Sequence, residues 1–143
     1  DVNGDGYADV IVGAYGHNSN TGKAYIYFGG PNMNSTADVT MTGEAASNLF
    51  GFSVSTAGDV NGDGYSDVII GERGYNSNTG RAYVYFGGSL MNNIADVILT
   101  GEVWNDITQT AANIELRSKV KDKDHRVFLD GVYAYEKKKG IEK

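Results

Sequence analysis

The chain has 143 residues, a formal net charge of −6 at pH 7 and 20 glycines, but it contains no cysteine. This length predicts one domain, and the lack of cysteine excludes disulfides as a source of stability. No apolar run approaches the roughly 18 residues of a membrane-spanning helix, so the sequence predicts neither a membrane span nor a signal peptide.

The chain begins with a glycine-rich stretch in which oxygen-bearing side chains occupy alternate positions. Asp1, Asn3, Asp5 and Asp9 offer carboxylate or amide oxygens, and the carbonyl of Tyr7 can fill the remaining gap. Calcium accepts about six to eight oxygen ligands in a flexible shell, so it tolerates this mixture. Three carboxylates in one turn repel each other by about 4 kcal/mol per pair at roughly 4 Å, and a divalent cation removes that repulsion. The stretch therefore predicts a calcium site.

Two other interpretations of this stretch are a hairpin turn and an EF-hand loop. A turn explains the Asn-Gly and Asp-Gly pairs, but it needs no acid at every second position. An EF-hand loop lies between helices and ends in a bidentate Glu at its twelfth position, where this chain has Val12. Residues 9–13 are a β-branched run closed by glycine, which predicts a buried strand directly after the loop.

Two further strands are predicted around Ala24–Phe28 and Val39–Thr42. A strand ahead of the first metal loop is missing, so the sequence is expected to begin inside a structural unit. Between the two strands, Asn34-Ser35-Thr36 is a glycosylation acceptor only if the host has that machinery.

The same pattern returns at an offset of 58 residues, where residues 1–44 align with 59–102 without a gap and 31 of the 44 pairs are identical. Such a period is typical of stacked units that cannot bury their own apolar faces. This copy has predicted strands around Phe52–Thr56, Val68–Ile70, Ala82–Phe86 and Asp96–Thr100, the content of one propeller blade. Its predicted metal ligands are Asp59, Asn61, Asp63, the carbonyl of Tyr65, and Asp67.

These residues resemble the FG-GAP repeats of integrin α-subunit propellers and of many bacterial and archaeal surface proteins. The Phe-Gly pair is Phe50-Gly51, and the aromatic strands end in Tyr27-Phe28-Gly29 and Tyr85-Phe86-Gly87. The second motif in the family's name, Gly-Ala-Pro, is matched imperfectly. The corresponding residues are Gly13-Ala14-Tyr15 in one copy and Gly71-Glu72-Arg73 in the other.

The resemblance covers about residues 1–102 and implies a β-propeller with calcium in the loop between the first two strands of each blade. It divides this part into residues 1–49, a blade lacking its first strand, and residues 50–102, a complete blade. By match, the ligands of the two implied calcium ions are Asp1, Asn3, Asp5, Tyr7 and Asp9, and Asp59, Asn61, Asp63, Tyr65 and Asp67.

Residues 103–143 are a different kind of sequence, with 9 basic and 7 acidic residues and no further acidic loop. Strand-like runs at 126–129 and 132–135 flank an Asp-Gly pair, so a charged hairpin or edge strand is favoured over a helix. The lysines at 137–139 are interpreted as a solvated end, and neither nucleic-acid binding nor membrane binding is predicted.

The predicted fold class is therefore all-β: blades of four antiparallel strands in a partial propeller of about two and a half blades, with a divergent β-rich tail. Propellers need roughly four to eight blades to close. We expect a fragment of a longer propeller whose full chain supplies further blades. An open stack covered by the tail and closure by self-association are the alternatives.

No enzyme activity is predicted, because no candidate nucleophile lies in a recognisable catalytic motif. In addition, a loop whose oxygens fill the coordination shell of the ion suits a structural metal rather than a catalytic one. The leading hypothesis is a calcium-stabilised extracellular or cell-surface module that binds a protein or glycan ligand in adhesion. The alternative is the non-catalytic propeller part of a secreted hydrolase or lyase. Loop residues that differ between the copies are candidates for a ligand face, although drift in unconstrained loops also explains them: Ala14, Tyr15 and His17, and Glu72, Arg73 and Tyr75.

Overall fold

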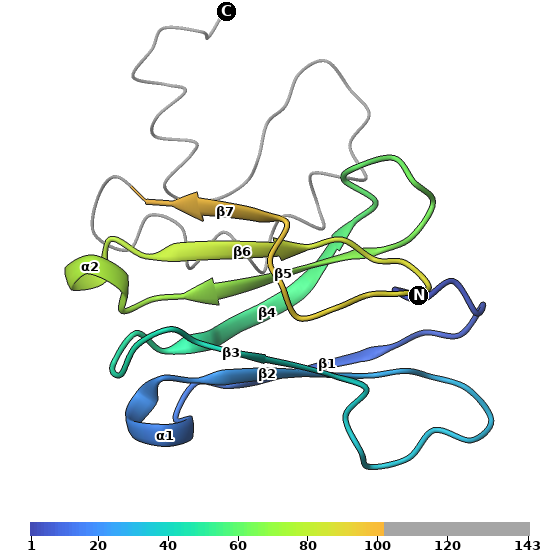
Figure 1. The fold of residues 1–143 in the computed structure, drawn as a ribbon, viewed down its shortest axis with the longest axis horizontal. Helices are drawn as coiled ribbons and strands as arrows, with labels where there is room; N and C mark the ends of the chain where they lie inside the picture. Colours follow the sequence, from blue (N-terminus) through green and yellow to red (C-terminus); the bar gives the residue numbers. More distant parts are fainter. Residues whose placement is uncertain (102–143) are drawn as a thin grey trace, which may run out of the picture.

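The computed structural model describes residues 1–101, which form two antiparallel sheets (Figure 1). The first sheet contains β1 (Val10–Ala14), β2 (Lys23–Tyr27) and β3 (Val39–Thr42). The second contains β4 (Phe50–Gly58), β5 (Asp67–Glu72), β6 (Arg81–Tyr85) and β7 (Val97–Thr100). The strands of each sheet follow chain order, and together the sheets make a partial β-propeller. The predicted all-β fold class is confirmed, whereas the predicted hairpin of the tail lies outside the described residues.

The two sheets repeat one register. Val10 lies opposite Tyr27 in the first sheet, and Val68 lies opposite Tyr85 in the second, again at an offset of 58 residues. The repeat seen in the sequence is therefore also a repeat of backbone pairing. Each residue of β1 has a structural equivalent in β5, which allows the surroundings of the two strands to be compared position by position.

The main apolar core lies between the two sheets. Alternate residues of each strand point to one face of a sheet, and here the facing sides of the two blades carry buried apolar side chains. Burial of apolar surface stabilises a fold by about 25 cal/mol per Å², so neither sheet is expected to be stable alone. The core is formed by Ala24, Ile26, Val39 and Met41 of the first sheet and by Val68, Ile70, Tyr83 and Tyr85 of the second.

The Phe-Gly pair joins the two blades at the start of β4. The Phe50 ring is 1% exposed and lies 5.2 Å from the Tyr83 ring in an edge arrangement. Gly51 has a φ of +78°, and a Cβ atom there would overlap the carbonyl oxygen of Lys23. Glycine is therefore required both by the left-handed backbone and by the close approach of β4 to the first sheet.

The predicted burial is right for β5 and wrong for β1. All six residues of β5 are buried, whereas in β1 Val10 is 45% and Val12 is 43% exposed. The reason is the face of the sheet that these residues occupy: Val68 and Ile70 lie on the face of the second sheet that packs against the first, whereas Val10 and Val12 lie on the face of the first sheet that points away from this core. Among residues 1–101, no further sheet packs on that outer face.

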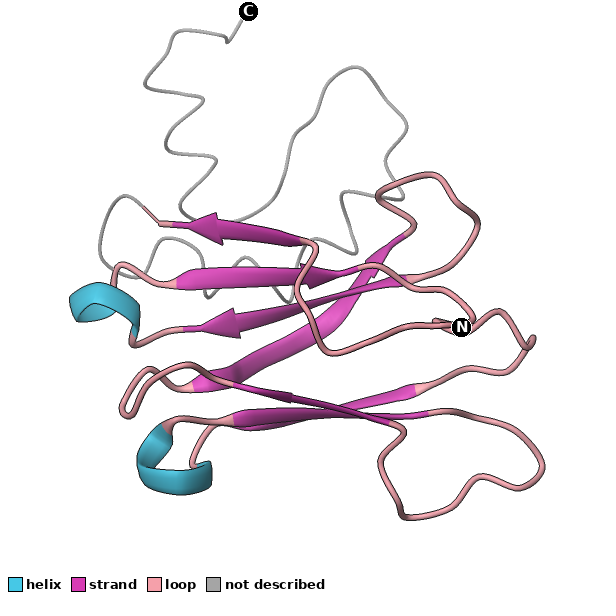
Figure 2. Ribbon diagram, in the orientation of Figure 1, coloured by secondary structure: helices cyan, strands magenta, loops and turns pink. Residues whose placement is uncertain are grey.

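Two single-turn helices were not predicted from the sequence. They are α1 (His17–Asn20) and α2 (Tyr75–Asn78), and they lie at one end of the sheets, shown in cyan in Figure 2. Both contain residues at positive φ, including Asn18 at +46° and Asn76 at +44°, which asparagine tolerates better than most residues. Within residues 1–101, no helix is long and apolar enough to cross a membrane.

Candidate metal centres

The first acidic loop is wound around the carboxylate of Asp1. The backbone N–H groups of Gly4 and Asp5 donate to Asp1 Oδ1 at 2.6 and 3.1 Å, and the N–H of Gly6 donates to Asp1 Oδ2 at 2.8 Å. Gly4 and Gly6 have φ values of +79° and +89°, which side chains other than glycine adopt at a cost. The glycines thus let three backbone donors converge on one acid.

The middle of the loop is held by its own polar side chains. The N–H of Tyr7 donates to Asp5 Oδ1 at 2.9 Å, and Asn3 Nδ2 donates to Asp5 Oδ2, also at 2.9 Å. These two bonds hold the pKa of the Asp5 carboxyl below its usual range, because hydrogen bonds to a carboxylate favour its charged form, and the bond from Tyr7 has the larger effect. Asp5 therefore carries a full negative charge at neutral pH.

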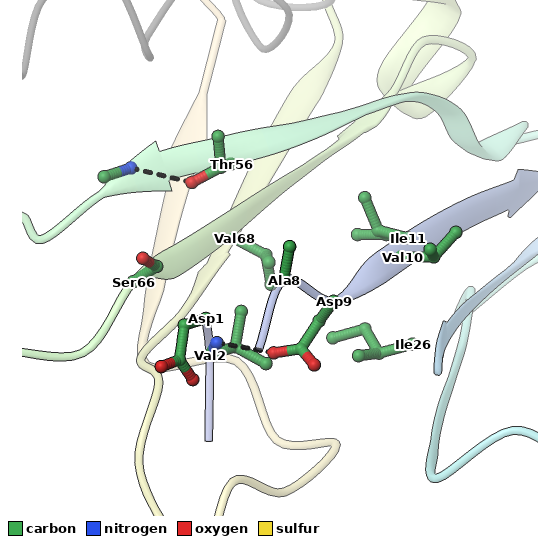
Figure 3. A pocket seen from close by; sticks show the side chains of 11 residues that line it. Asp1, Val2, Ala8, Asp9, Val10, Ile11, Ile26, Thr56, Ser66 and Val68 are labelled. Carbon is green, nitrogen blue, oxygen red and sulfur yellow. Dashed lines mark hydrogen bonds between the residues drawn. The ribbon is translucent and has the colours of Figure 1, made fainter. Parts of the chain in front are cut away.

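The last acid of the loop ties it to the neighbouring hairpin. Asp9 accepts hydrogen bonds from the N–H of Val2 at 2.6 Å, which Figure 3 shows, and from the N–H of Gly29 at 2.7 Å. Gly29 follows β2, so the Asp9 carboxylate links the beginning of the loop to the end of the next strand. The presence of an acid at position 9 is explained by these backbone hydrogen bonds as well as by metal binding.

The second loop reproduces the first bond by bond. Asp59 accepts from the N–H groups of residues 62, 63 and 64, Asn61 Nδ2 donates to Asp63 Oδ2 at 2.7 Å, and Tyr65 N donates to Asp63 Oδ1 at 2.9 Å. Asp67, which is 0% exposed, accepts from Val60 N at 2.7 Å and from Gly87 N at 2.8 Å. The two predicted ligand sets therefore have one common geometry.

The two loops also touch each other across the blade boundary. The N–H of Ser66 donates to the carbonyl of Asp1 at 3.1 Å, and the N–H of Gly88 donates to the carbonyl of Val2 at 2.7 Å. A Cβ atom on Gly4 would overlap the ring of Tyr65. The first loop is therefore packed against residues of the second blade.

Basic side chains are confined to one end of the strands. The basic side chains of residues 1–101 are Lys23, Arg73 and Arg81, and all three lie at the end where β1 turns into β2 and β5 turns into β6. The other end holds eight carboxylates, the six loop aspartates together with Asp38 and Asp96, which accept from the N–H groups of residues 28 and 86. The acidic loops thus have no basic side chain at their end of the described sheets.

The chemistry of the loops fits calcium, although their side chains are not gathered as a finished site. Among residues 1–101, no three His, Asp or Glu side chains converge into a group that could hold a metal ion. A carboxylate has about four lone-pair directions, and the hydrogen bonds of Asp1, Asp5 and Asp9 leave at least one free on each. The available donors are all oxygen atoms, which calcium prefers.

The loop residues proposed for a ligand face lie at the end opposite the acidic loops. Tyr15 and Phe52 have ring centroids 5.4 Å apart, and the Arg73 guanidinium lies 5.2 Å from the Phe52 centroid. Tyr15 is 49% and Phe52 is 41% exposed. The structure therefore brings Tyr15 and Arg73 together through Phe52, which the sequence comparison did not single out because it lies in a strand.

The other candidate residues of that face have structural partners. The guanidinium of Arg81 stacks on the Tyr75 ring at 3.4 Å and pairs with Glu44 at 3.3 Å. Glu72 is 0% exposed, burial raises the pKa of its carboxyl, and the Tyr83 hydroxyl donates to it at 2.7 Å. Glu72 is therefore buried away from any ligand, whereas Tyr75 is partly exposed and packs against Arg81.

The two sheets and the paired loops define a segment of an integrin-like β-propeller. The family model of the FG-GAP repeat matches residues 1–27 and 50–85. Integrin alpha-5 of Xenopus laevis is 31% identical over 96 residues, which are 61% of this chain and 9% of that protein. Integrin alpha-PS2 of Drosophila melanogaster is 38% identical over 107 residues, 66% of this chain and 8% of that protein. Over these residues the chain is therefore similar to the FG-GAP repeats and to integrin alpha subunits.

A second similarity is to a protein of a different kind. The large ribosomal subunit protein uL6 of Aeropyrum pernix is 58% identical over 43 residues, which are 30% of this chain and 24% of that protein. The chain thus spans about a quarter of this relative and less than a tenth of the two integrins.

Proposed function

We propose that residues 1–101 are a calcium-stabilised propeller module that serves extracellular or cell-surface adhesion rather than catalysis. The observation that supports this most directly is the pair of matching acidic loops, which lie at the end of the sheets that lacks Lys and Arg. Carboxylates that repel one another and have no basic neighbour gain stability from a divalent cation.

Calcium would be held in each loop by the three acids, the Asn amide oxygen and one tyrosine carbonyl. The amide N–H of Asn61 now points at Asp63 Oδ2, in the direction from which a cation would approach that carboxylate. Binding would therefore turn the amide so that its oxygen, a ligand calcium accepts, faces the ion and gives up the bond it accepts from the Asp63 N–H at 3.0 Å. The same change is expected at Asn3 and Asp5, whose contact is equivalent.

Thermal melts in EDTA, calcium and magnesium test this proposal. At a hundredfold excess over its dissociation constant, a ligand of the folded state adds about 2.7 kcal/mol, so we expect calcium to raise Tm by on the order of 10 °C. Magnesium should act much less, because it demands a compact octahedron and keeps its water. Equal midpoints in EDTA and calcium would exclude calcium stabilisation.

Two matched variants show whether the loop is responsible. Asp63→Asn keeps an acceptor for the Tyr65 N–H but removes one loop charge, so the calcium-dependent rise in Tm should shrink. Asp96→Asn removes one charge from the same end of the sheets and keeps an acceptor for the Phe86 N–H, so the full rise should remain. If both variants respond alike, the ligand assignment is wrong.

We propose that the protein or glycan ligand contacts the cluster of Tyr15, Phe52 and Arg73. Tyrosine, phenylalanine and arginine are enriched in interfaces, and here they are stacked and partly exposed at the junction of two blades. A ligand found on arrayed glycans and proteins should bind Tyr15→Ser about tenfold more weakly. Tyr7→Ser, an exposed tyrosine at the other end, is the control, and equal losses in the two variants would contradict this location.

A further inference from the structure

A buried acid and the arginine opposite it are not bonded to each other at the junction of the two blades. Glu72, the last residue of β5, pairs in the sheet with Arg81, the first residue of β6. Among the residues that the structure describes, Glu72 Oε1 and Arg81 Nε are buried side-chain atoms without a hydrogen-bond partner. The first repeat has no such pair, because Ala14 lies opposite Lys23 there. Unpaired buried polar atoms are rare in folded proteins, so this arrangement requires a physical reason.

The Arg81 guanidinium is bonded to the connection between the blades, residues 43–49. Its Nη1 atom donates to Glu44 Oε2 at 3.3 Å, and its Nη2 atom donates to the Tyr75 hydroxyl. The side chain of Glu44 is 61% exposed, whereas Glu72 is 0% exposed and accepts from the Tyr83 hydroxyl at 2.7 Å. One arginine therefore has an exposed acid and a buried acid as neighbours, and it pairs with the exposed one.

The burial of Glu72 favours its neutral form. A carboxylate that is removed from water without an ion pair binds a proton instead, and burial accordingly raises the pKa of the Glu72 carboxyl, while hydrogen bonds from Tyr83 and Asn48 lower it by less. β4 places Phe50 opposite Glu72 and adds no charge there. The polar and charged groups that act on Glu72 are those of Asn48 and Glu44 in the blade connection and of Arg81 and Tyr83 on β6.

We propose that Glu72 is a proton-controlled latch on the blade connection. With its proton, Glu72 is neutral, and Arg81 stays on Glu44 and holds residues 43–49 against the second blade. Without the proton, the buried charge attracts the guanidinium, whose Nε then has an acceptor, and the bond to Glu44 is given up. The Asn48 amide suits both states, because it can donate to a carboxylate or accept from an acid. Arg81 is thus the two-state element that the proton biases, and calcium takes no part.

Glu72→Gln tests the proton, because glutamine has the shape of the neutral acid and cannot ionise. Folding raises the pKa of Glu72, so the stability that the proton contributes is present below the unfolded value of 4.5 and is lost as pH rises through the folded pKa. In urea unfolding of the whole chain in EDTA, the unfolding constant of the wild type should therefore rise relative to that of Glu72→Gln by about tenfold per pH unit within this window. A ratio that stays constant across pH would overturn the proposal.

Glu44→Gln is the matched control, because it removes an exposed acid from the same cluster and leaves the buried acid in place. Measured against the double variant Glu44→Gln/Glu72→Gln, it should keep the pH-dependent loss of stability. Disappearance of that loss in Glu44→Gln would assign the proton to Glu44 and overturn the proposal.

The exchange of partners by Arg81 is followed at the Gly74 N–H, which donates to the carbonyl of Asn48 at 2.7 Å and ties the second blade to the blade connection. Protection of this amide from hydrogen exchange should fall by on the order of tenfold as Glu72 loses its proton, and it should stay constant in Glu72→Gln. Carboxyl ¹³C NMR of the wild type reports the proton directly, even if Glu72→Gln does not fold. A Glu72 signal that titrates at or below 4.5, or unchanged Gly74 protection while Glu72 titrates, would overturn the latch.

Discussion

Gly51→Ala is expected to destabilise the blade junction by about 3 kcal/mol or more. A left-handed φ costs an alanine about 1–2 kcal/mol, and an added carbon in a packed site costs about 1–3 kcal/mol more. At Gly51 both apply, because φ is +78° and the new Cβ would overlap the Lys23 carbonyl and lie 3.3 Å from Ala14 N. Urea unfolding in EDTA, followed by tyrosine fluorescence, measures the loss.

Gly62→Ala is the matched control for this variant. Gly62 has a φ of +80°, almost the same as that of Gly51, but no atom lies within 4 Å of the position a Cβ would take. Only the backbone cost of about 1–2 kcal/mol then applies. The excess loss in Gly51→Ala isolates the close approach of β4 to the first sheet, and equal losses in the two variants would show that this approach is unimportant.

Asp67→Ala should lower stability even when no metal is present. Asp67 is fully buried and accepts the N–H groups of Val60 and Gly87. The variant leaves two backbone donors without their acceptor, and each unsatisfied buried group costs about 1–3 kcal/mol. We therefore expect a loss of about 3 kcal/mol in the free energy of unfolding, measured by urea titration in EDTA.

Asp63 provides the contrast within the same loop. Its side chain is exposed and keeps its bond to the Tyr65 N–H in Asp63→Asn, so this variant should lose less than about 1 kcal/mol in EDTA. If Asp67→Ala is also near neutral in EDTA, the last acid of the loop serves metal alone. Comparison of the two variants thus distinguishes Asp67, which holds the backbone, from Asp63, which is needed only for its charge.

The strands and the acidic loops could be predicted because their causes are local. β-branched and aromatic runs predict strands at positions 10–12, 68–70 and 82–86, and alternate oxygen side chains predict the two loops. The role of Gly51 could not be predicted, because it depends on how closely β4 approaches the carbonyl of Lys23. Likewise, the stacking of Arg73 on Phe52 depends on the bulge that displaces the pairing of β4 between residues 50 and 53.

Other features depended on information that the sequence pattern does not contain. The exposure of Val10 and Val12 follows from their place on the face of the first sheet that points away from the core between the two sheets. The separation of basic and acidic ends follows from the register that places Lys23 and Arg81 at the opposite end from the loops. Both are properties of the assembled sheets, in which residues distant in the sequence become neighbours.

The hydrogen bonds from Ser66 to Asp1 and from Gly88 to Val2 give the stack a direction. They close the first loop with residues of the blade that follows it, and Val2 is 5% exposed as a result. Val60, at the equivalent position of the second loop, is 49% exposed. In a repeat array, neighbour interactions of this kind set how order spreads from unit to unit. Each blade seals the loop before it, so the array is polar, and its two ends are not interchangeable as sites for adding a blade.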